Sequence, residues 1–395
     1  MTTTVNNEQK KLNVPNLRFP EFQGEWEMFT FDEIAQYKKG PFGSALKKDL
    51  FVPQSENAIK VYEQQNAIKK DWTLSRYYIT KDYFNAHMKQ FVAKAGDLIV
   101  SCAGTIGEVY ELPKDAEEGV FNQALMRVRV NNEVVNKEIF ITVFSSMIDK
   151  FSKIYSNGSA IKNIPPFADL KKTQVYLPCK EEQIVIAQLL RSLDERIATQ
   201  NKIIEDLKKL KSAISKKLLC NDKWTTCIIQ DIAEIGRGRV ISSVEIDRQK
   251  NPLYPVYSSQ TSNNGIMGYL DNYMFDGEYI TWTTDGANAG TVFYRKGKFN
   301  CTNVCGTLKI LPKFDCYFVS LVLQQATQKY VSSNLANPKL MNNTMASIKI
   351  RMPNIETQKQ LSKVFQTLDS CLLVHQRTCK MYLSEKQYLL RQMLI

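Results

Sequence analysis

A chain of 395 residues with 44% hydrophobic and 23% charged residues is long enough for two or three domains and too apolar to be disordered. It has no apolar run of about 18 residues and no secretory signal at its N-terminus, so the sequence predicts a cytoplasmic protein without a transmembrane helix. Its formal net charge of +12 fits either simple solubility or a polyanionic partner.

The cysteines and histidines form no recognisable ligand pattern. Nine cysteines are scattered without a C-x-x-C pair, and His87 and His375 lie far from the closest spaced cysteines, Cys301 and Cys305. A zinc site needs closely spaced Cys or His ligands, and a disulfide framework needs an even number of cysteines. The sequence therefore predicts reduced thiols of a cytosolic protein and no metal site.

The first globular segment opens at Trp26, in G-E-W-E-M-F-T-F-D-E-I-A. Short runs rich in Val, Ile, Tyr and Thr follow, with a glycine-rich turn in A-G-D-L-I-V-S-C-A-G-T-I-G (95–107). A helix is predicted over 136–153. The segment ends in the strand V-Y-L before Pro178, because proline cannot donate to a strand ladder.

A long helix follows Pro178. Glu181 and Glu182 occupy its first turn, where the helix dipole favours negative charge. Apolar residues then alternate in steps of three and four, with polar interruptions at Gln200 and Lys211, which is a heptad seam. A helix of about 35 residues is roughly 50 Å long.

The same organisation then recurs. Trp224 opens a second segment 198 residues later (224 − 26), and D-G-E-Y-I-T-W-T-T-D-G-A-N-A-G (276–290) resembles residues 95–107. A second helix pattern covers 316–330. The motif Pro-x-x-Glu-x-Gln returns at Pro353, 175 residues after Pro178 (353 − 178), and leads into a second ungapped heptad seam. Two unrelated amphipathic helices could share a rhythm, but the shared motif favours an internal repeat.

These patterns predict an α+β (mixed α/β) fold of two tandem globular domains, each followed by a long helix. The two helices are expected to form an antiparallel coiled coil with pseudo-twofold symmetry, because each seam alone would leave leucines in water. The predicted domains are 1–178 and 221–353, with helices over 179–220 and 354–395. The seam residues expected at the helix or partner interface are Ile186, Leu190, Leu193, Ile197, Leu361, Phe365, Leu368 and Leu372.

Catalytic motifs are not found. N-I-P-P-F (163–167) is close to the Asn-Pro-Pro-aromatic motif of adenine methyltransferases, but Ile164 interrupts it and no cofactor loop precedes it. I-G-R-G-R-V (235–240) lacks the third glycine of a dinucleotide fingerprint, and no Walker loop occurs. We therefore predict no catalytic residue, no metal and no cofactor in this chain.

Loops rich in amide, hydroxyl and basic side chains occur at equivalent places in both segments. Gln and Asn read adenine edges, Arg reads guanine, and Lys and Ser hold phosphates. A single such loop is more often an ordinary solvated turn, but the recurrence favours DNA. The candidate DNA contacts are Lys39, Ser44, Lys47, Gln64, Gln65, Asn66, Arg237, Arg239, Ser259, Gln260, Asn263 and Asn264.

The doubled W…E/D-I-A starts, glycine-rich turns and Pro-x-x-Glu-Gln-type motifs resemble the specificity subunit of type I restriction–modification enzymes over the whole chain. E-E-Q fits the family pattern, whereas E-T-Q in the second copy departs slightly. The resemblance implies that each globular domain is a target-recognition domain, which reads one half of a bipartite, asymmetric DNA target at a separation fixed by the coiled coil. It also implies two modification subunits carrying S-adenosylmethionine, and restriction subunits using ATP and Mg²⁺, in a bacterial cytoplasm.

Two other functions stay open at this point. A self-contained DNA adenine methyltransferase would bind S-adenosylmethionine as the purified chain alone. A non-enzymatic coiled-coil scaffold would assemble partners without salt-sensitive DNA binding.

Overall fold

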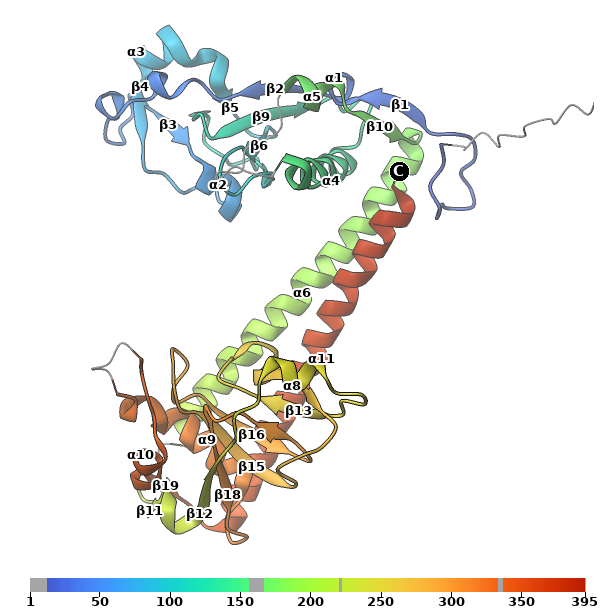
Figure 1. Cartoon of the computed structure of the whole chain (residues 1–395). Coiled ribbons are helices and arrows are strands. Elements are labelled where there is room, and N and C mark those ends of the chain that lie inside the picture. The colour runs from blue at the N-terminus through green and yellow to red at the C-terminus, as the bar shows by residue number, and fades with distance from the viewer. Residues whose placement is uncertain (1–12, 156–166, 220–221, 333–336, 395) are drawn as a thin grey trace, which may run out of the picture. The chain divides into compact units, whose positions relative to one another are not determined.

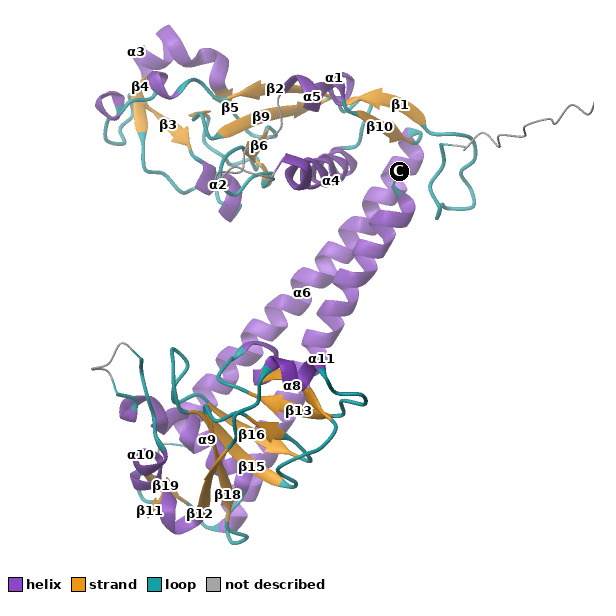
Figure 2. Cartoon of the chain, viewed as in Figure 1, coloured by secondary structure: helices purple, strands orange, loops and turns teal. Residues whose placement is uncertain are grey.

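The structure is a computed structural model that describes residues 13–155, 167–219, 222–332 and 337–394. The chain divides into two compact units, unit 1 with Met1–Ile197 and Met381–Ile395, and unit 2 with Ala198–Lys380 (Figure 1). Two helices of 39 residues, α6 (Lys180–Leu218) and α11 (Ile355–Met393), each contribute residues to both units. Strands and helices are mixed within each unit, as Figure 2 shows.

The described residues of unit 1 form two four-stranded sheets and a separate strand pair. One sheet has the order β2-β9-β6-β7: Ala35–Lys39, Leu125–Val130, Leu98–Ser101 and Val109–Glu111. The other has the order β4-β3-β8-β5: Tyr78–Thr80, Ala58–Tyr62, Gly119–Phe121 and Val92–Ala93. The strand pair is β1 (Glu27–Thr30) with β10 (Gln174–Leu177). The α-helices before α6 are α1 (Phe31–Ile34), α2 (Gln64–Lys69), α3 (Lys81–Tyr83), α4 (Lys137–Tyr155) and α5 (Phe167–Lys172).

Unit 2 repeats this plan with a smaller second sheet. Its four-stranded sheet has the order β12-β18-β15-β16: Ala233–Arg237, Cys305–Ile310, Glu278–Thr283 and Val292–Lys296. The three-stranded sheet has the order β14-β13-β17: Ile266–Leu270, Tyr254–Tyr257 and Asn300–Cys301. The strand pair is β11 (Thr225–Ile228) with β19 (Lys349–Met352). The α-helices between α6 and α11 are α7 (Ile229–Ile232), α8 (Ser243–Asp247), α9 (Cys316–Ala326) and α10 (Asn342–Ser347).

The start and end of each globular segment pair with each other. β1 runs antiparallel to β10, and β11 runs antiparallel to β19, so the tryptophan-led opening lies beside the strand that precedes the proline. In both units a short helix, α1 or α7, then joins this first strand to the main sheet. The predicted internal repeat and mixed α/β fold are therefore confirmed.

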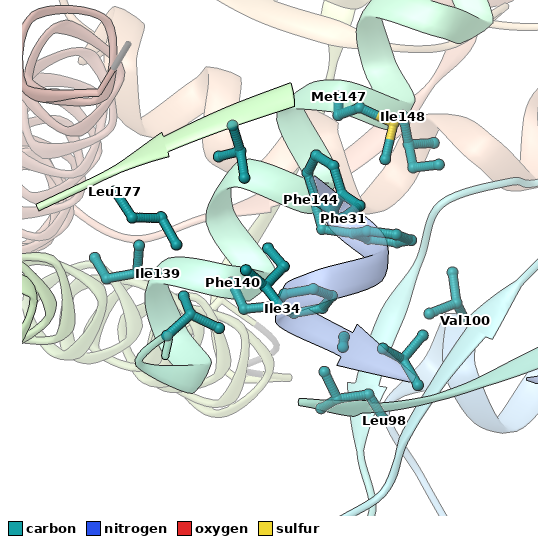
Figure 3. Packing of buried hydrophobic residues seen from close by; sticks show 14 of the residues in the cluster. Phe31, Ile34, Leu98, Val100, Ile139, Phe140, Phe144, Met147, Ile148 and Leu177 are labelled. Carbon is teal, nitrogen blue, oxygen red and sulfur yellow. The ribbon is translucent and has the colours of Figure 1, made fainter. Parts of the chain in front are cut away.

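Each unit has its own hydrophobic core. In unit 1 the rings of Phe31, Phe140 and Phe144 lie within 5.4 to 6.2 Å of one another, between α1 and α4 (Figure 3). In unit 2 the core contains Trp282 and Phe318, both fully buried. Aromatic rings in contact stabilise a core beyond their buried area, so the three phenylalanines add to the stability of unit 1.

The long helices extend these cores. Ile186 and Leu190 of α6 belong to the unit 1 core, together with Met393 of α11. Phe365 of α11 belongs to the unit 2 core, with Leu361 and Leu368 packed against it. Leu193 is buried, whereas Ile197 and Leu372 are half-buried. The predicted seam thus joins each helix to a globular core as well as to the other helix.

Within each unit α6 and α11 run antiparallel, as the contacts between them show. In unit 1, Lys386 Nζ donates to Asp194 Oδ1 over 2.5 Å. In unit 2, Lys211 pairs with Asp369, and Gln200 Oε1 lies 2.7 Å from His375 Nδ1. The polar interruptions of the two heptad seams are therefore contacts between the helices. The two ion pairs are also equivalent in the repeat, at an offset of 175 residues (369 − 194 and 386 − 211).

The repeated glutamine after each proline connects the long helix to its globular domain. Gln183 Oε1 accepts from Asn136 N at 2.6 Å, and its Nε2 donates to Pro178 O at 2.9 Å. In the second copy Gln358 Oε1 accepts from Asp315 N at 2.9 Å and Nε2 donates to Pro353 O at 2.8 Å. Both glutamines are 1% exposed. The motif therefore satisfies buried backbone groups where α6 meets the start of α4, and where α11 meets the start of α9.

Replacing either glutamine with alanine should destabilise its own unit. Because each change leaves a buried donor and acceptor unpaired, we expect a loss of roughly 1–3 kcal/mol in the free energy of unfolding. Chemical denaturation of Q183A and Q358A measures this loss. The matched controls Q188A and Q360A, at exposed positions on the same helices, should stay within about 0.5 kcal/mol of the parent. If Q183A and Q358A lost no more unfolding free energy than Q188A and Q360A, the two buried glutamines would not stabilise their units in this way.

Candidate nucleic-acid interface

Four segments of unit 1 meet at one end of its sheets. The end of β2 is joined to the start of β9 by a hydrogen bond from Gly40 N to Leu125 O (2.9 Å). Cys102 N donates to Ala124 O (2.8 Å), and Asn122 N donates to Tyr62 O (3.1 Å). We call this set the unit 1 loop edge, made of Lys39–Gly40, Tyr62–Gln65, Cys102–Thr105 and Asn122–Ala124.

Unit 2 builds the same edge with the same backbone contacts. Gly238 N donates to Cys305 O (3.1 Å), Thr284 N to Val304 O (2.9 Å), and Thr302 N to Tyr257 O (2.9 Å). Each bond has a counterpart in unit 1 that joins the corresponding segments. The unit 2 loop edge is made of Arg237–Arg239, Tyr257–Gln260, Thr284–Asn288 and Thr302–Val304. The loops that the sequence nominated separately therefore converge on one edge in each unit.

A glycine at the same place in each edge allows the loops to approach closely. A Cβ atom on Gly40 would lie 2.0 Å from the carbonyl oxygen of Asn122. A Cβ atom on Gly238 would lie 2.1 Å from that of Cys301. Such contacts are far inside van der Waals distance, so only glycine fits at either position.

The nominated residues of unit 1 differ in exposure. Lys39 and Gln65 are exposed, and so are Ser44 and Lys47 on the segment that follows Gly40. The Gln64 side chain is half-buried, and its Nε2 donates to Ala103 O and to Thr105 O (3.0 Å). Gln64 therefore links the start of α2 to the glycine-rich turn after β6.

Asn66 is buried and serves the domain itself. Its Oδ1 accepts from Glu63 N (2.8 Å), while its Nδ2 donates to Asp71 O (2.9 Å) and Leu74 O (2.8 Å). These bonds cap α2 and fold the following turn onto it. Asn66 is also only 2% exposed, unlike the half-buried Gln64, so a nucleic acid has no access to it and it is not among the contacts proposed below.

The two nominated arginines of unit 2 both have carboxylate partners. Arg237 Nε donates to Asn303 O, and its Nη2 donates to Thr284 Oγ1 (3.2 Å) and Asp285 Oδ2 (3.3 Å). Arg239 forms a bidentate pair with Glu245, whose hydrogen bonds raise the pKa of Arg239. The same pair lowers the pKa of Glu245. The fork of Arg239 is therefore occupied by a carboxylate in the unbound chain.

The remaining nominated residues lie on the loop between β13 and β14. Ser259 O accepts from Asn288 Nδ2 (3.1 Å), and Gln260 donates to Ile266 O. Asn263 and Asn264 are exposed and have left-handed backbone conformations, with φ of 48° and 55°. Consecutive left-handed residues cost free energy and persist where the surrounding structure holds them.

A buried arginine beneath this loop was not predicted. The Arg295 guanidinium lies 3.5 Å from the centroid of the Tyr257 ring, and Nε donates to Thr281 Oγ1 (3.2 Å). Its residue is 3% exposed, and burial lowers the pKa of Arg295 to about 10. In unit 1, Arg127 of β9 similarly reaches Val92 O of the second sheet. An arginine thus connects the two sheets in each unit.

The segment N-P-K-L also joins the unit 2 loop edge. Gly286 N donates to Pro338 O (3.0 Å), and Lys339 Nζ lies 3.8 Å from Asp285 Oδ1. The corresponding N-I-P-P of the first copy lies outside the described residues.

The described part of the chain offers little for metal or thiol chemistry. It holds no group of three or more His, Cys, Asp or Glu residues placed to bind a metal ion. Cys305 and Cys301 are buried thiols, and burial raises the pKa of Cys305 to about 11, which makes it a poor nucleophile at neutral pH. None of the helices in the described ranges has the length and apolarity needed to span a bilayer.

A family model decides between the functions that the sequence left open. The model for the type I restriction modification DNA specificity domain matches the chain twice, over residues 23–209 and 221–380. The chain belongs to this family. Each match covers one globular segment and much of the long helix that follows, so the internal repeat is a repeat of the specificity domain.

Similar proteins agree with this assignment. The type I restriction enzyme MpnII specificity subunit of Mycoplasma pneumoniae is 42% identical over 146 residues, which cover 36% of this chain and 43% of that protein. A second Mycoplasma pneumoniae protein, named as a type I specificity subunit, is 36% identical over 220 residues, covering 54% of this chain and 81% of its own length.

A solved structure shares the fold. The S subunit of a type I restriction–modification system from M. genitalium matches with a TM-score of 0.64 at 18% identity, covering 97% of this chain and 99% of that one. Two tandem target-recognition domains with long helices are therefore the architecture of this specificity subunit. Its function is recognition of a DNA target, and neither alternative function is favoured.

Proposed function

We propose that this specificity subunit recognises a bipartite, asymmetric DNA sequence, one half with each loop edge. The observation that carries this proposal is the same four-segment edge, built twice with the same backbone hydrogen bonds. Each edge consists of loops tied by these hydrogen bonds to the ends of the strands, and recognition residues are commonly carried on loops that a scaffold positions.

The two edges carry different chemistry on the same framework. The unit 1 edge offers Lys39, Gln64 and Gln65, with Ser44 and Lys47 close by in sequence. The unit 2 edge offers Arg237, Arg239, Ser259 and Gln260, with Asn263 and Asn264 on the same loop. Amides favour adenine and arginine favours guanine in the major groove. We therefore expect the two half-sites to differ in sequence.

The paired helices are the proposed spacer between the half-sites. A helix of 39 residues is about 58 Å long, and duplex DNA presents equivalent faces about every 34–36 Å. Polar contacts between α6 and α11 hold their register within each unit, as the Lys386–Asp194 and Lys211–Asp369 pairs illustrate.

The chemistry on DNA belongs, in this proposal, to partner subunits. Two modification subunits would supply S-adenosylmethionine and methylate adenine, and restriction subunits would use ATP and Mg²⁺. This chain would contribute no catalytic group. The repeat supports the proposal because it provides two similar surfaces for two copies of one partner.

Alanine pairs test the proposed contacts. Replacing Gln64 and Gln65, or Arg237 and Arg239, should weaken binding of the full-length chain to its target duplex by roughly tenfold or more. The arginine pair should also reduce the slope of affinity against salt. A control is Lys296→Ala, whose side chain is 72% exposed at the far end of β15 and β16. Target binding that is unchanged in both double variants would show these residues to be wrongly assigned.

A further inference from the structure

The two arginines of the unit 2 loop edge differ in which guanidinium nitrogens have hydrogen-bond partners. Arg237 is fixed along one side: Nε donates to the Asn303 carbonyl, and Nη2 to Thr284 and Asp285. Among the described residues Nη1 has no hydrogen-bond partner, and the side chain is 36% exposed. Arg239 instead gives both Nη1 and Nη2 to the Glu245 carboxylate.

Asp285 is itself held in place. It accepts from the hydroxyl of Thr284, a fully buried residue, over 2.5 Å. Lys339 Nζ approaches its other oxygen at 3.8 Å. The Asp285 side chain is 20% exposed, so this carboxylate forms part of the edge rather than a solvated surface charge.

This arrangement suits a base and disfavours a phosphate. A guanidinium that is already oriented loses little conformational freedom on binding, and its planar fork matches the paired acceptors N7 and O6 of guanine. A phosphate brought to the same tip would meet the negative charge of Asp285 nearby. At Arg239, by contrast, a phosphate could replace the Glu245 carboxylate with the same charge and geometry.

We propose that Arg237 reads a guanine in the half-site bound by unit 2, and that Asp285 is the positioning residue that aims it. This inference rests on the proposed function, because it assumes that the unit 2 loop edge contacts DNA. It separates the two arginines that the sequence grouped together: Arg237 discriminates bases, and Arg239 contributes charge.

Two substitutions that remove the same charge test the assignment. The full-length chain carrying Asp285→Asn or Glu245→Gln is bound to a duplex library randomised across the target, and the bound duplexes are sequenced. We expect D285N to lose about tenfold of its guanine preference at one position, with other positions unchanged. E245Q should bind all sequences more tightly and keep every preference. R237K should lose the guanine preference at the same position as D285N, because lysine offers a single point charge and not a planar fork.

The outcomes distinguish this inference from the function on which it rests. If D285N and R237K keep the guanine preference, or if they lose base preference at all positions alike, Arg237 is not positioned by Asp285 to contact a guanine and the inference fails. If the parent chain shows no salt-dependent duplex binding, the proposed function fails and the inference falls with it. The assignment is supported if the parent chain selects its target and both D285N and R237K lose the base preference at the same single position.

Discussion

Replacing Gly40 with alanine should abolish recognition of one half-site, and replacing Gly238 should abolish recognition of the other. The added Cβ would meet Asn122 O at 2.0 Å in the first case, and Cys301 O at 2.1 Å and Thr302 O at 2.4 Å in the second. These are backbone atoms, which cannot rotate away as a side chain would. The strand end and the facing turn must therefore separate, and the edge loses the geometry that presents its side chains.

Gly43 provides a matched control close to Gly40. A Cβ atom there would have no neighbour within 4 Å, so G43A should bind like the parent chain. The bases selected from a randomised duplex library report both half-sites in one experiment. G40A and G238A should each lose one block of selected bases and keep the other, because each unit has its own core. Loss of both blocks in either variant, or of neither, would contradict separate reading edges.

Removing the Arg18 guanidinium should destabilise unit 1 by about 3 kcal/mol. Arg18 donates from Nε and Nη2 to the two oxygens of Glu182, at 2.8 and 2.7 Å, and Glu182 is 1% exposed at the start of α6. R18A would leave a buried carboxylate without its cation, which costs more than the pair contributes when intact. Thr357 occupies the equivalent position in the second copy, so unit 2 lacks this ion pair.

Glu182→Gln in the R18A background tests this explanation. Because the double variant removes the uncompensated charge, it should recover much of the stability lost in R18A. Denaturant unfolding gives the total change, and hydrogen exchange of the first turns of α6 locates it in unit 1. An R18A chain as stable as its parent, or a double variant no better than R18A, would exclude a buried ion pair as the cause.

Features set by local spacing could be predicted from the sequence. The doubled Pro-x-x-Glu-x-Gln motif fixed where each long helix begins, and heptad spacing identified the faces that α6 and α11 bury. Gln200 and Lys211 were predicted only as interruptions of the seam. The structure explains them, because Gln200 contacts His375 and Lys211 pairs with Asp369 across the helices.

Features set by tertiary contacts could not be predicted in the same way. Arg295 lies in V-F-Y-R-K, where alternation along a strand does not reveal that the far face is covered by a second sheet. Asp285 and Lys339 are distant in sequence, so their proximity has no local signal. Asn66 follows two nominated glutamines, yet its side chain turns inward to cap α2. The amide side chain of Asn66 suggested a contact with DNA, but the burial of this residue excludes one.

Selection from a duplex library randomised over more than two helical turns tests most directly whether the repeated chain reads DNA twice. Two blocks of selected bases at one fixed separation, different in sequence from each other, are the predicted result. The blocks should respond separately to G40A and G238A. One block of selected bases, or two copies of the same block, would contradict recognition of an asymmetric bipartite target by two loop edges that carry different side chains.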